Sequence, residues 1–390
     1  MELVKKGYKK TEVGVIPDDW DVKLIEDICN ISVGRDLQEM IFSKQLDSNY
    51  PYPVYSNTVE NLGLYGYYKQ PEYTGESLTI VGRGIGLGTT FARSGGFGAI
   101  GRLLVLFPKS GINNKFLAFY INNRIKIFEE SGGIPQLTGI SVSKYKVSLP
   151  PTLTEQKAIA DALTDVEELI TNLEKLIAKK KAIKQGAMQQ LLTPKNSWKE
   201  NKLEDTVLII RSGGTPSSTI KKYYNGSIPF LSIGDMTEQG KYLTFTSNRV
   251  SQEGIENSAS WIVEKDTLIY SMYASVGFVS ITKISLAISQ AVLCIKFKKE
   301  YSNEFMYYLL SNMQKSVMKY VGEGTQKNLN AQTVKNFIIK TPSLNEQENI
   351  AEFLKVMDEG IEKMGLRITK LKNVKKGMMQ ELLTGKTRLI

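Results

Sequence analysis

The side chains that most enzymes use for nucleophilic and metal chemistry are missing or isolated in this sequence. The chain contains no histidine. This absence excludes Ser-His-Asp and Cys-His triads, HExxH zinc proteases and Cys2His2 zinc fingers. The only two cysteines, Cys29 and Cys294, are far apart in sequence, which excludes a disulfide framework and predicts reduced thiols in the cytoplasm. Catalysis by this chain would have to rest on carboxylates, Lys, Tyr or Cys.

Two glycine-containing segments imitate nucleotide-binding loops but lack the required surroundings. The run Gly82-Arg-Gly-Ile-Gly-Leu-Gly88 follows a predicted strand without a βαβ unit, so a hairpin turn is the favoured interpretation. Gly385-Lys-Thr387 resembles the end of a Walker A loop, but Gln380 stands where its first glycine is required. The motif Asn/Asp-Pro-Pro-Tyr/Phe of amino-methyltransferases, a convincing Pro-Asp…Glu-x-Lys nuclease pattern and metal-ligand clusters are also missing. These observations favour a binding protein over an enzyme.

Side chains suited to reading DNA bases occur in several polar, loop-like segments. Arginine can hold guanine through two hydrogen bonds, Asn or Gln can hold adenine, and Tyr combines an apolar ring with a polar tip. Our candidates for DNA contact in the first half of the chain are Tyr55, Asn57, Arg83, Arg93 and Gln136. Those in the second half are Lys222, Lys241, Tyr273, Gln290, Gln326 and Asn328. We expect fewer than half of them to contact bases, and the others to contact phosphate or solvent.

A duplication organises the chain around these candidates. Residues 151–193 align without a gap on residues 342–384, with 19 identities in 43 positions. Both copies open with a similar segment, Pro151-Thr-Leu-Thr-Glu-Gln156 and Pro342-Ser-Leu-Asn-Glu-Gln347. Thr154 and Asn345 are the expected N-caps of two long helices.

Apolar residues in both copies recur at alternating steps of four and three, which predicts a heptad seam. Two helices with matching seams should pack on one another, and an antiparallel pair within one chain is the predicted arrangement. The seam positions expected to meet are Ile170, Leu173 and Ile177 in the first helix and Ile361, Met364 and Ile368 in the second. Lysines late in each helix, including Lys181 and Lys372, suit the helix dipole and are also candidates for contact with a partner or DNA.

The remaining segments, residues 1–150 and 194–341, are rich in glycine, β-branched residues and tyrosine. Short apolar runs in both segments predict strands at 77–81, 103–107, 267–270 and 291–297, and short helices are expected near 115–129 and 304–320. The predicted fold class is therefore α+β, with two α/β domains of similar fold joined by two long antiparallel helices as a coiled coil. The predicted boundaries are 1–150, 151–193, 194–341 and 342–390, related by an internal pseudo-twofold duplication.

The overall composition is compatible with a protein that binds nucleic acid. The 390 residues include 50 Lys and Arg against 40 Asp and Glu, a net charge of +10, which fits an electrostatic contribution to such binding. No apolar run of about 18 residues and no signal peptide are found, so we expect a cytoplasmic protein without membrane contact.

The order of these motifs resembles the specificity subunit of type I restriction–modification enzymes, across nearly the whole chain. The resemblance rests on Gly14-Val-Ile-Pro-Asp-Asp-Trp20, the two Glu-Gln repeats, Tyr52-Pro-Val-Tyr-Ser-Asn57, Ile228-Pro-Phe-Leu-Ser-Ile-Gly-Asp235 and Met379-Gln-Glu-Leu-Leu-Thr-Gly-Lys-Thr-Arg388. Two features depart from the pattern: the second opening is shortened to Lys195-Asn-Ser-Trp198, and Pro194 replaces the glycine that follows the second helix.

The resemblance implies a function. Residues 1–150 and 194–341 would be target-recognition domains that each read one half of a bipartite, asymmetric site on double-stranded DNA, while the helices hold them apart. The helices would also dock two methyltransferase subunits that use S-adenosylmethionine to methylate adenine at N6. Restriction subunits would add ATP- and Mg²⁺-dependent cleavage. This chain would bind no cofactor or metal and perform no catalysis.

Two other classes of function stay open at this point. A stand-alone nuclease or methyltransferase would act on DNA without partners. A two-headed structural adaptor without a DNA role would show no salt-dependent retention on heparin or duplex DNA.

Overall fold

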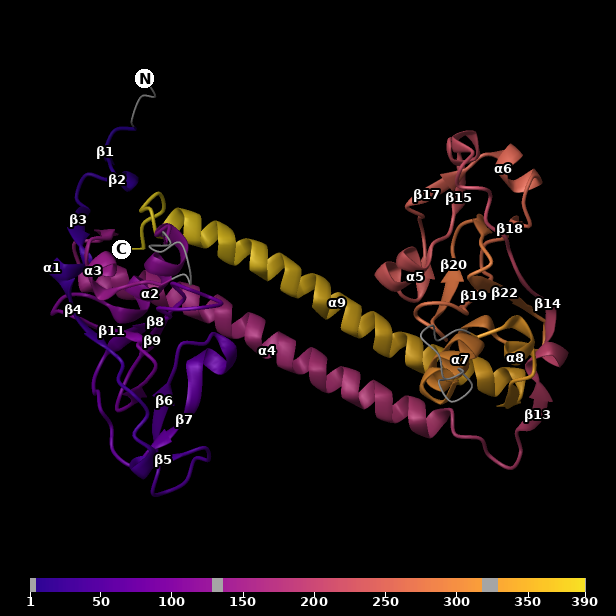
Figure 1. The fold of residues 1–390 in the computed structure, drawn as a ribbon, viewed down its shortest axis with the longest axis horizontal. Coiled ribbons are helices and arrows are strands. Elements are labelled where there is room, and N and C mark those ends of the chain that lie inside the picture. Colours follow the sequence, from indigo (N-terminus) through magenta and orange to yellow (C-terminus); the bar gives the residue numbers. More distant parts are fainter. Residues whose placement is uncertain (1–4, 128–135, 318–328, 390) are drawn as a thin grey trace. The chain divides into compact units, whose positions relative to one another are not determined.

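The computed structural model describes residues 5–127, 136–317 and 329–389 (Figure 1). The chain forms two compact units. Unit 1 consists of Met1–Glu174 with Leu366–Ile390, and unit 2 consists of Lys175–Gly365. Two long helices, α4 (Leu153–Leu191) and α9 (Leu344–Leu382), each contribute one half to either unit.

Unit 1 is built on a four-stranded antiparallel sheet and a second, smaller sheet. The main sheet has the strand order β4 (Cys29–Val33), β11 (Leu104–Pro108), β8 (Ser77–Ile80) and β9 (Thr90–Arg93). The second has the order β10 (Gly98–Ala99), β6 (Tyr52–Tyr55), β7 (Leu64–Tyr68) and β5 (Phe42–Ser43). Two further pairs are β1 (Tyr8–Thr11) with β2 (Gly14–Pro17) and β3 (Asp21–Leu24) with β12 (Lys146–Leu149). The helical segments are α1 (Ile25–Ile28), η1 (Glu39–Ile41), η2 (Glu60–Gly63), α2 (Asn114–Arg124) and α3 (Gly139–Ser143).

Unit 2 repeats this plan with one additional strand in its main sheet and, among the residues that the structure describes, without a counterpart of the β1–β2 pair. Its main sheet has the order β14 (Val207–Ser212), β22 (Val292–Phe297), β19 (Leu268–Ser271), β20 (Val279–Thr282) and β16 (Tyr242–Leu243). Its second sheet has the order β17 (Asn248–Val250), β15 (Ile228–Phe230), β21 (Leu286–Ile288) and β18 (Trp261–Val263). β13 (Lys199–Lys202) pairs with β23 (Ile338–Thr341). The helical segments are η3 (Leu203–Thr206), η4 (Lys221–Tyr224), α5 (Ile233–Gln239), α6 (Gln252–Glu256), α7 (Asn303–Val317) and α8 (Ala331–Lys335).

Apart from β16, the main sheets of the two units match strand for strand, which confirms the duplication predicted from the sequence. β4, β8, β9, β11, α2 and α3 of unit 1 correspond in order and pairing to β14, β19, β20, β22, α7 and α8 of unit 2. The predicted strands and short helices are present, and β8 and β9 form the predicted hairpin across the glycine run. Gly84, Gly86 and Gly88 adopt positive φ in that hairpin, a conformation that glycine adopts readily.

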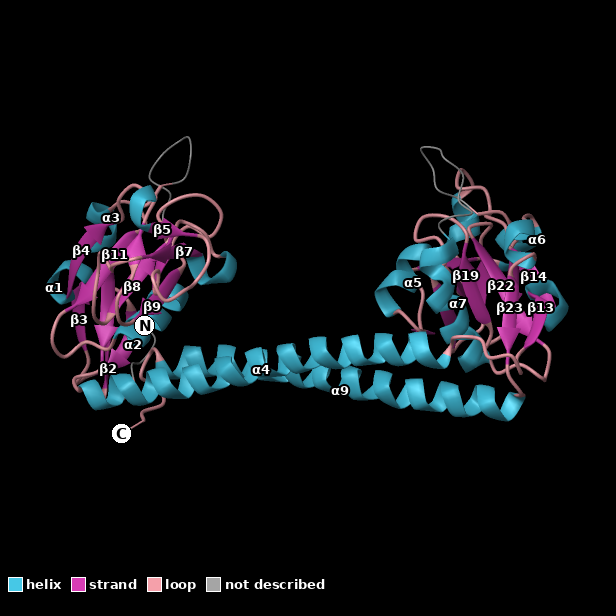
Figure 2. Ribbon diagram, turned by 90° about the horizontal axis from the view of Figure 1, so that it is seen from below, coloured by secondary structure: helices cyan, strands magenta, loops and turns pink. Residues whose placement is uncertain are grey.

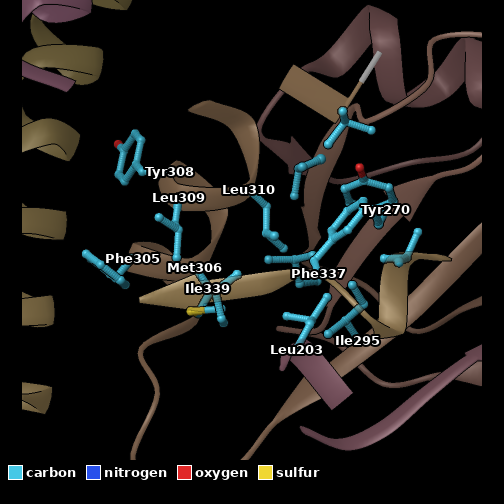
Figure 3. Packing of buried hydrophobic residues seen from close by; sticks show 14 of the residues in the cluster. Leu203, Tyr270, Ile295, Phe305, Met306, Tyr308, Leu309, Leu310, Phe337 and Ile339 are labelled. Carbon is cyan, nitrogen blue, oxygen red and sulfur yellow. The ribbon is translucent and has the colours of Figure 1, made fainter. Parts of the chain in front are cut away.

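The apolar core of each unit continues from the sheet into the long helices. In unit 2, Tyr270, Ile295 and Leu310 pack with Phe337 between the main sheet and α7 (Figure 3). The same core takes in Met188 of α4 and Leu354 of α9. In unit 1, Ile159, Leu163 and Leu382 have the equivalent role. Each domain is therefore fixed to its own portion of the helix pair by shared hydrophobic burial.

A buried glutamine near the start of each long helix adds a polar anchor. Gln156 is 2% exposed; its amide oxygen accepts from Asn113 N at 2.9 Å and its amide nitrogen donates to Gly111 O at 3.1 Å. Gln347 is 1% exposed and repeats these bonds with Ser302 N at 2.9 Å and Glu300 O at 3.2 Å. The Glu-Gln repeat in the sequence therefore ties the long helix to the turn that begins α2 or α7.

The long helices each have 39 residues and a length of about 58 Å. Their predicted caps were wrong by two residues. The hydroxyl of Thr152 accepts from Glu155 N at 3.2 Å, and that of Ser343 accepts from Glu346 N at 3.4 Å. Because a cap precedes the first helical turn, the residue just after each proline takes this role and Thr154 and Asn345 lie inside the helices.

Ion pairs show that the helix portions run antiparallel within each unit. In unit 1, Glu167 and Glu174 of α4 pair with Lys375 and Lys372 of α9 at 2.7 and 2.8 Å. In unit 2, Lys184 of α4 pairs with Asp358 of α9, and Lys195, just after α4, pairs with Glu346 at 2.8 Å. As residue numbers rise along α4, those of the partners on α9 fall. Among the described residues, no helix is long and apolar enough to cross a membrane.

Candidate nucleic-acid interface

One end of the main sheet in unit 1 gathers several of the predicted DNA-contacting residues. Leu104 of β11 lies opposite Val33 of β4 and Ile80 of β8, so the loops next to these residues lie at the same end of the sheet. We call this end rim 1 and define it by Gly34–Arg35, Gly82–Arg83, Gly101–Leu103 and Gln136–Leu137. Backbone bonds from Gly34 N to Leu103 O (2.7 Å) and from Leu137 N to Gly82 O (2.8 Å) hold it together. α3, which follows rim 1, lies at the end of unit 1 away from α4 and α9 (Figure 2).

Three predicted residues meet at rim 1. The Asn57 side chain accepts from Gly82 N at 2.8 Å and donates to Gly101 O, so it joins two loops of the rim. Arg83 is exposed and donates to Gln136 Oε1 at 3.1 Å. A guanidinium held by an amide in this way is oriented for a base edge or a phosphate.

Two arginines that the sequence analysis missed add positive charge to rim 1. Arg35 and Arg102 are both exposed, and Arg102 lines a hollow of about 180 Å³ together with Arg83 and Gln136. Arg35 follows β4 and Gly34, whereas Arg102 precedes β11 and follows Gly101. An arginine beside a glycine at a strand end was the sequence signal that could have identified them.

The other two candidates in unit 1 lie inside the domain. Arg93 is only 8% exposed. Its Nε donates to Thr79 Oγ1 at 3.0 Å, and its guanidinium lies 3.5 Å from the centre of the Tyr55 ring. Burial lowers the pKa of Arg93 to about 10, so the side chain is still charged at neutral pH. These contacts favour a structural role for Arg93 and Tyr55.

Unit 2 has an equivalent rim with different side chains. Rim 2 is defined by Gly213–Gly214, Met272–Tyr273, Ser289–Ala291 and Leu329–Asn330. One backbone bond repeats rim 1, because Leu329 N donates to Met272 O at 2.9 Å as Leu137 N donates to Gly82 O. Gly213 N, which corresponds to Gly34 N, donates to Ser289 O at 3.1 Å, three residues before the counterpart of Leu103. Tyr273, which is 38% exposed, follows Met272 as Arg83 follows Gly82. Gln290 is exposed in the adjoining loop and accepts from Thr215 Oγ1.

Of the remaining candidates in unit 2, none is placed by the structure at rim 2. Lys222 of η4 is exposed and paired with Glu253, which raises the Lys222 pKa. The Lys241 side chain is 12% exposed and lies 2.6 Å from Glu304, and burial lowers its pKa. Gln326 and Asn328 lie outside the described residues.

The helix candidates differ in their surroundings. Ile170 and Ile368 are buried, whereas Leu173, Ile177, Ile361 and Met364 are half-buried, as the heptad pattern predicts for seam positions. Lys372 is engaged with Glu174, while Lys181 is exposed beside a hollow that Lys184 and Asp358 also line. Both helices also carry large apolar side chains on their exposed sides: Leu169, Leu176 and Ile183 on α4, and Phe353, Val356, Leu366 and Val374 on α9.

The two thiols lie in apolar surroundings that keep them protonated. Cys29 and Cys294 are free and buried, and burial raises the pKa of each thiol to about 12. Within the described ranges, no cluster of three or more Cys, Asp or Glu side chains could hold a metal ion.

Comparison with protein families identifies the family of this chain. The profile described as type I restriction modification DNA specificity domain matches twice, at residues 17–185 and 195–373. The chain belongs to the type I restriction–modification specificity-subunit family. Subunits of this family are non-catalytic DNA-recognition proteins that assemble with other subunits, so the family confirms the resemblance seen in the motifs.

Two named relatives match over nearly the full length of this specificity subunit, and a third matches over about half of it. A protein of Methanocaldococcus jannaschii that carries the provisional name MjaX type I restriction enzyme specificity subunit is 27% identical, covering 99% of this chain and 97% of its own. The MjaVIII specificity subunit of the same organism is 24% identical over 100% and 98% of the two chains. The HindI specificity subunit of Haemophilus influenzae is 30% identical over 48% of this chain and 41% of its own.

Solved structures share the fold. The S subunit of a type I system from M. genitalium superposes with a TM-score of 0.65 at 15% identity, covering 93% of this chain and 96% of that chain. A chain from a study of the assembly of a type I system gives a TM-score of 0.59 at 14% identity, covering 95% and 99%. These likenesses confirm the predicted fold class of two similar α/β domains with long antiparallel helices.

Proposed function

We propose that this specificity subunit reads a bipartite, asymmetric site on double-stranded DNA, one half with rim 1 and the other with rim 2. The observation that carries the proposal is the repetition of one rim geometry with different side chains. Arg83 and Tyr273 occupy the same position, each following the residue whose carbonyl accepts from a leucine amide. Because the backbone geometry is similar, the two rims would present Arg83 and Tyr273 to the DNA in the same way. Because the side chains differ, they would select different bases.

The chemistry of rim 1 favours guanine and phosphate. Arg35, Arg83 and Arg102 supply three exposed guanidinium groups to this rim. Arginine binds O6 and N7 of guanine through two hydrogen bonds and also pairs with phosphate oxygens. Rim 2 offers the Tyr273 ring and the Gln290 amide, which suit apolar contact and adenine. The two half-sites should therefore differ in sequence.

The long helices support the proposed contact with partners. The exposed large apolar side chains on α4 and α9, which include those named above, form surfaces of the kind that bury against another protein. We assign these surfaces to two methyltransferase subunits that carry S-adenosylmethionine, with restriction subunits that use ATP and Mg²⁺ joining the assembly. Lys181 is exposed on α4 and would contact an acidic partner surface or the DNA backbone.

The decisive experiment exchanges one domain. Residues 194–341 are replaced by the corresponding domain of another family member, and the assembled methyltransferase is tested by methylation-sensitive sequencing. We expect the half-site read by unit 2 to change and the other half-site to persist. If both half-sites change, or neither does, the assignment of one rim to each half-site is wrong.

A matched pair of point variants tests the rims themselves. Arg83→Ala should relax the unit 1 half-site, whereas Arg93→Lys, which alters a buried arginine, should leave sequence preference unchanged. Incubating the purified chain alone with DNA, Mg²⁺ and S-adenosylmethionine should give neither cleavage nor methylation. A product in that reaction would favour the stand-alone enzyme, and absence of salt-dependent DNA retention would favour the adaptor.

A further inference from the structure

The two main sheets end differently on the side that faces α2 or α7. In unit 2, β16 lies parallel to β20 and completes a fifth strand. In unit 1, β9 occupies the position of β20, and it is the last strand of its sheet. Unit 1 therefore has a sheet edge at the place where unit 2 has a strand of its own.

The register identifies the residue at which the edge is open. Ile281 of β20 lies opposite Leu268 and donates its amide to Lys241 O at 2.7 Å. Ala92 of β9 has the same place opposite Leu78, so its amide and carbonyl point outward. Among the described residues, no hydrogen bond to these outward groups of Ala92 is found. Two residues earlier, Asn122 satisfies both outward groups of Thr90, at 2.8 and 2.7 Å.

A groove runs along this edge within unit 1. It has a volume of about 610 Å³ and lies between β9, α2 and the adjoining portions of α4 and α9. Phe91 and Phe119 give it apolar walls. Its charged groups are Glu167, Lys115, Lys375 and the buried Arg93. We call it the edge groove. Its size and mixed lining suit an extended peptide segment.

One part of the surroundings is the same in both units. Lys375 pairs with Glu167 and lies 5.8 Å from the Phe119 ring in unit 1. In unit 2, Lys184 pairs with Asp358 and lies 5.6 Å from the Tyr308 ring. The edge groove is thus the equivalent of the space that Lys241 and β16 fill in unit 2.

The charge at the mouth of the groove is reversed between the units. Glu304 is the second residue after Ser302, and Lys115 is the second residue after Asn113, so the glutamine anchors place them equivalently. Glu304 receives Lys241 at 2.6 Å. Lys115 is exposed and forms no ion pair with any residue that the structure describes. An occupant of the edge groove should therefore carry a carboxylate where β16 carries Lys241.

We infer that the edge groove binds an extended acidic segment of a partner protein. The segment pairs parallel to β9, accepts the Ala92 amide with a backbone carbonyl, and places an Asp or Glu beside Lys115. An apolar residue after the acidic one lies against Phe91 and Phe119. The outward backbone groups of Ala92 and the apolar walls suit a peptide strand, which distinguishes this surface from rim 1.

A pair of labelled peptides tests the inference on the full chain. The first has the sequence of residues 239–245, which includes β16, with Lys241→Glu; the second keeps Lys241. Fluorescence anisotropy should show that the acidic peptide binds about tenfold more tightly than the basic one, because Lys115 attracts one and repels the other. Equal affinity, or no binding of either peptide at about 1 mM, would overturn the inference.

Two variants separate charge from backbone pairing. Lys115→Glu should invert the preference, so that the basic peptide binds more tightly. Ala92→Pro removes the outward amide at an edge position, where proline is tolerated, and should abolish binding of both peptides. Ala92→Ser keeps the amide and should bind as the unaltered chain does. Unchanged preference in Lys115→Glu contradicts the inference even if Ala92→Pro fails to fold. No DNA is present in these measurements, so their outcome is independent of the proposed function.

Discussion

Unit 1 and unit 2 close the same fold by different means. In unit 2, the chain passes directly from α4 through Pro194 into Trp198 and β13. In unit 1, the corresponding helix α9 is followed by residues 383–389, of which Arg388 contacts Asp19 and Trp20, just before β3, without a direct peptide connection. We call the ion pairs of Arg388 with Asp19 and Glu155 the clasp. In unit 1 the clasp connects the segments that a direct peptide link joins in unit 2.

The clasp is formed by buried and exposed carboxylates together. Arg388 bonds Asp19 through two contacts of 2.9 and 3.0 Å and also bonds Glu155, which is 1% exposed. The hydrogen bonds that Arg388 donates to Glu155 and Asp19 raise the pKa of Arg388. In unit 2, the equivalent Glu346 pairs with exposed Lys195. This ion pair should contribute less to stability, because the peptide chain already joins α4 to β13 there.

The largest effect should come from breaking the clasp. Arg388→Ala leaves the carboxylate of Glu155 buried without its partner, and loss of one member of a buried ion pair costs about 3–5 kcal/mol. We expect the free energy of unfolding of unit 1 to fall accordingly, measured by hydrogen exchange of the unit 1 amides over a urea series. Arg388→Ala combined with Glu155→Gln should recover part of the loss.

The control for this prediction is the matching pair in unit 2. Lys195→Ala removes an exposed partner of Glu346, and exposed ion pairs contribute little. Its unfolding curve should nearly overlay that of the unaltered chain. Similar losses in Arg388→Ala and Lys195→Ala would contradict the difference between the two closures.

A second pair of variants should affect the two units alike. Gln156→Ala and Gln347→Ala each leave a buried amide and carbonyl groups without a partner, which costs about 1–3 kcal/mol. Hydrogen exchange should show faster opening of the start of α2 in the first variant and of α7 in the second. Faster hydrogen exchange in only one of the two variants would mean that the glutamine anchors are not equivalent.

The rims should differ in DNA binding rather than in stability. Arg83→Ala removes the exposed guanidinium of rim 1 and should cost about 1–3 kcal/mol in binding of the unit 1 half-site. Tyr273→Ala should weaken the other half-site and leave the first unchanged. Competition with DNA that carries substitutions in one half-site measures both effects. Uniform weakening across all sequences would assign Arg83 to phosphate instead.

The duplication and the helices were predictable because they rest on local patterns. The Glu-Gln repeat and the heptad steps lie within single segments, and the burial of Ile159, Leu163 and Ile170 follows the predicted period. The hairpin after β8 was predictable for the same reason, since the glycine run indicates the turn.

The burial of individual charged residues depends on residues far along the chain. Arg93 is enclosed by Tyr55 and Leu62, and Lys241 by Glu304 and Tyr308, which no local pattern connects. Both therefore resemble surface cations in the sequence. Arg102 directly precedes an apolar strand segment, yet its side chain is exposed. Its place in rim 1 follows from the pairing of β11 with β4 and β8, which brings distant loops to one end of the sheet.

Substitution of two helix lysines, Lys181 and Lys372, should have a smaller effect than the changes described above. Lys181→Glu changes a side chain that no described residue pairs with, so it should weaken assembly with partner subunits and leave the fold intact. Lys372→Glu places a second acid beside Glu174 and should also reduce helix pairing in unit 1. Size-exclusion chromatography of the assembled complex over a salt series, with thermal unfolding of the free chain, separates the two. If Lys181→Glu assembles as the unaltered chain does at every salt concentration, Lys181 is not part of the partner surface.

The smallest expected effect is a dependence of unit 1 on acid through the exposed arm of the clasp. The hydrogen bond from Arg388 lowers the pKa of Asp19 from its ordinary value of 3.8. A carboxyl whose pKa is lower in the folded state stabilises the fold above its unfolded pKa, and this contribution is lost as the pH falls through the folded value. Urea midpoints of unit 1 should therefore decline more steeply below pH 3.8 in the unaltered chain than in Asp19→Asn, where no proton is taken up at this position. Because Asp19 is half exposed, solvent screens the pair and the difference should be small. Identical acid profiles for the two proteins would leave Glu155 as the carboxylate that holds Arg388.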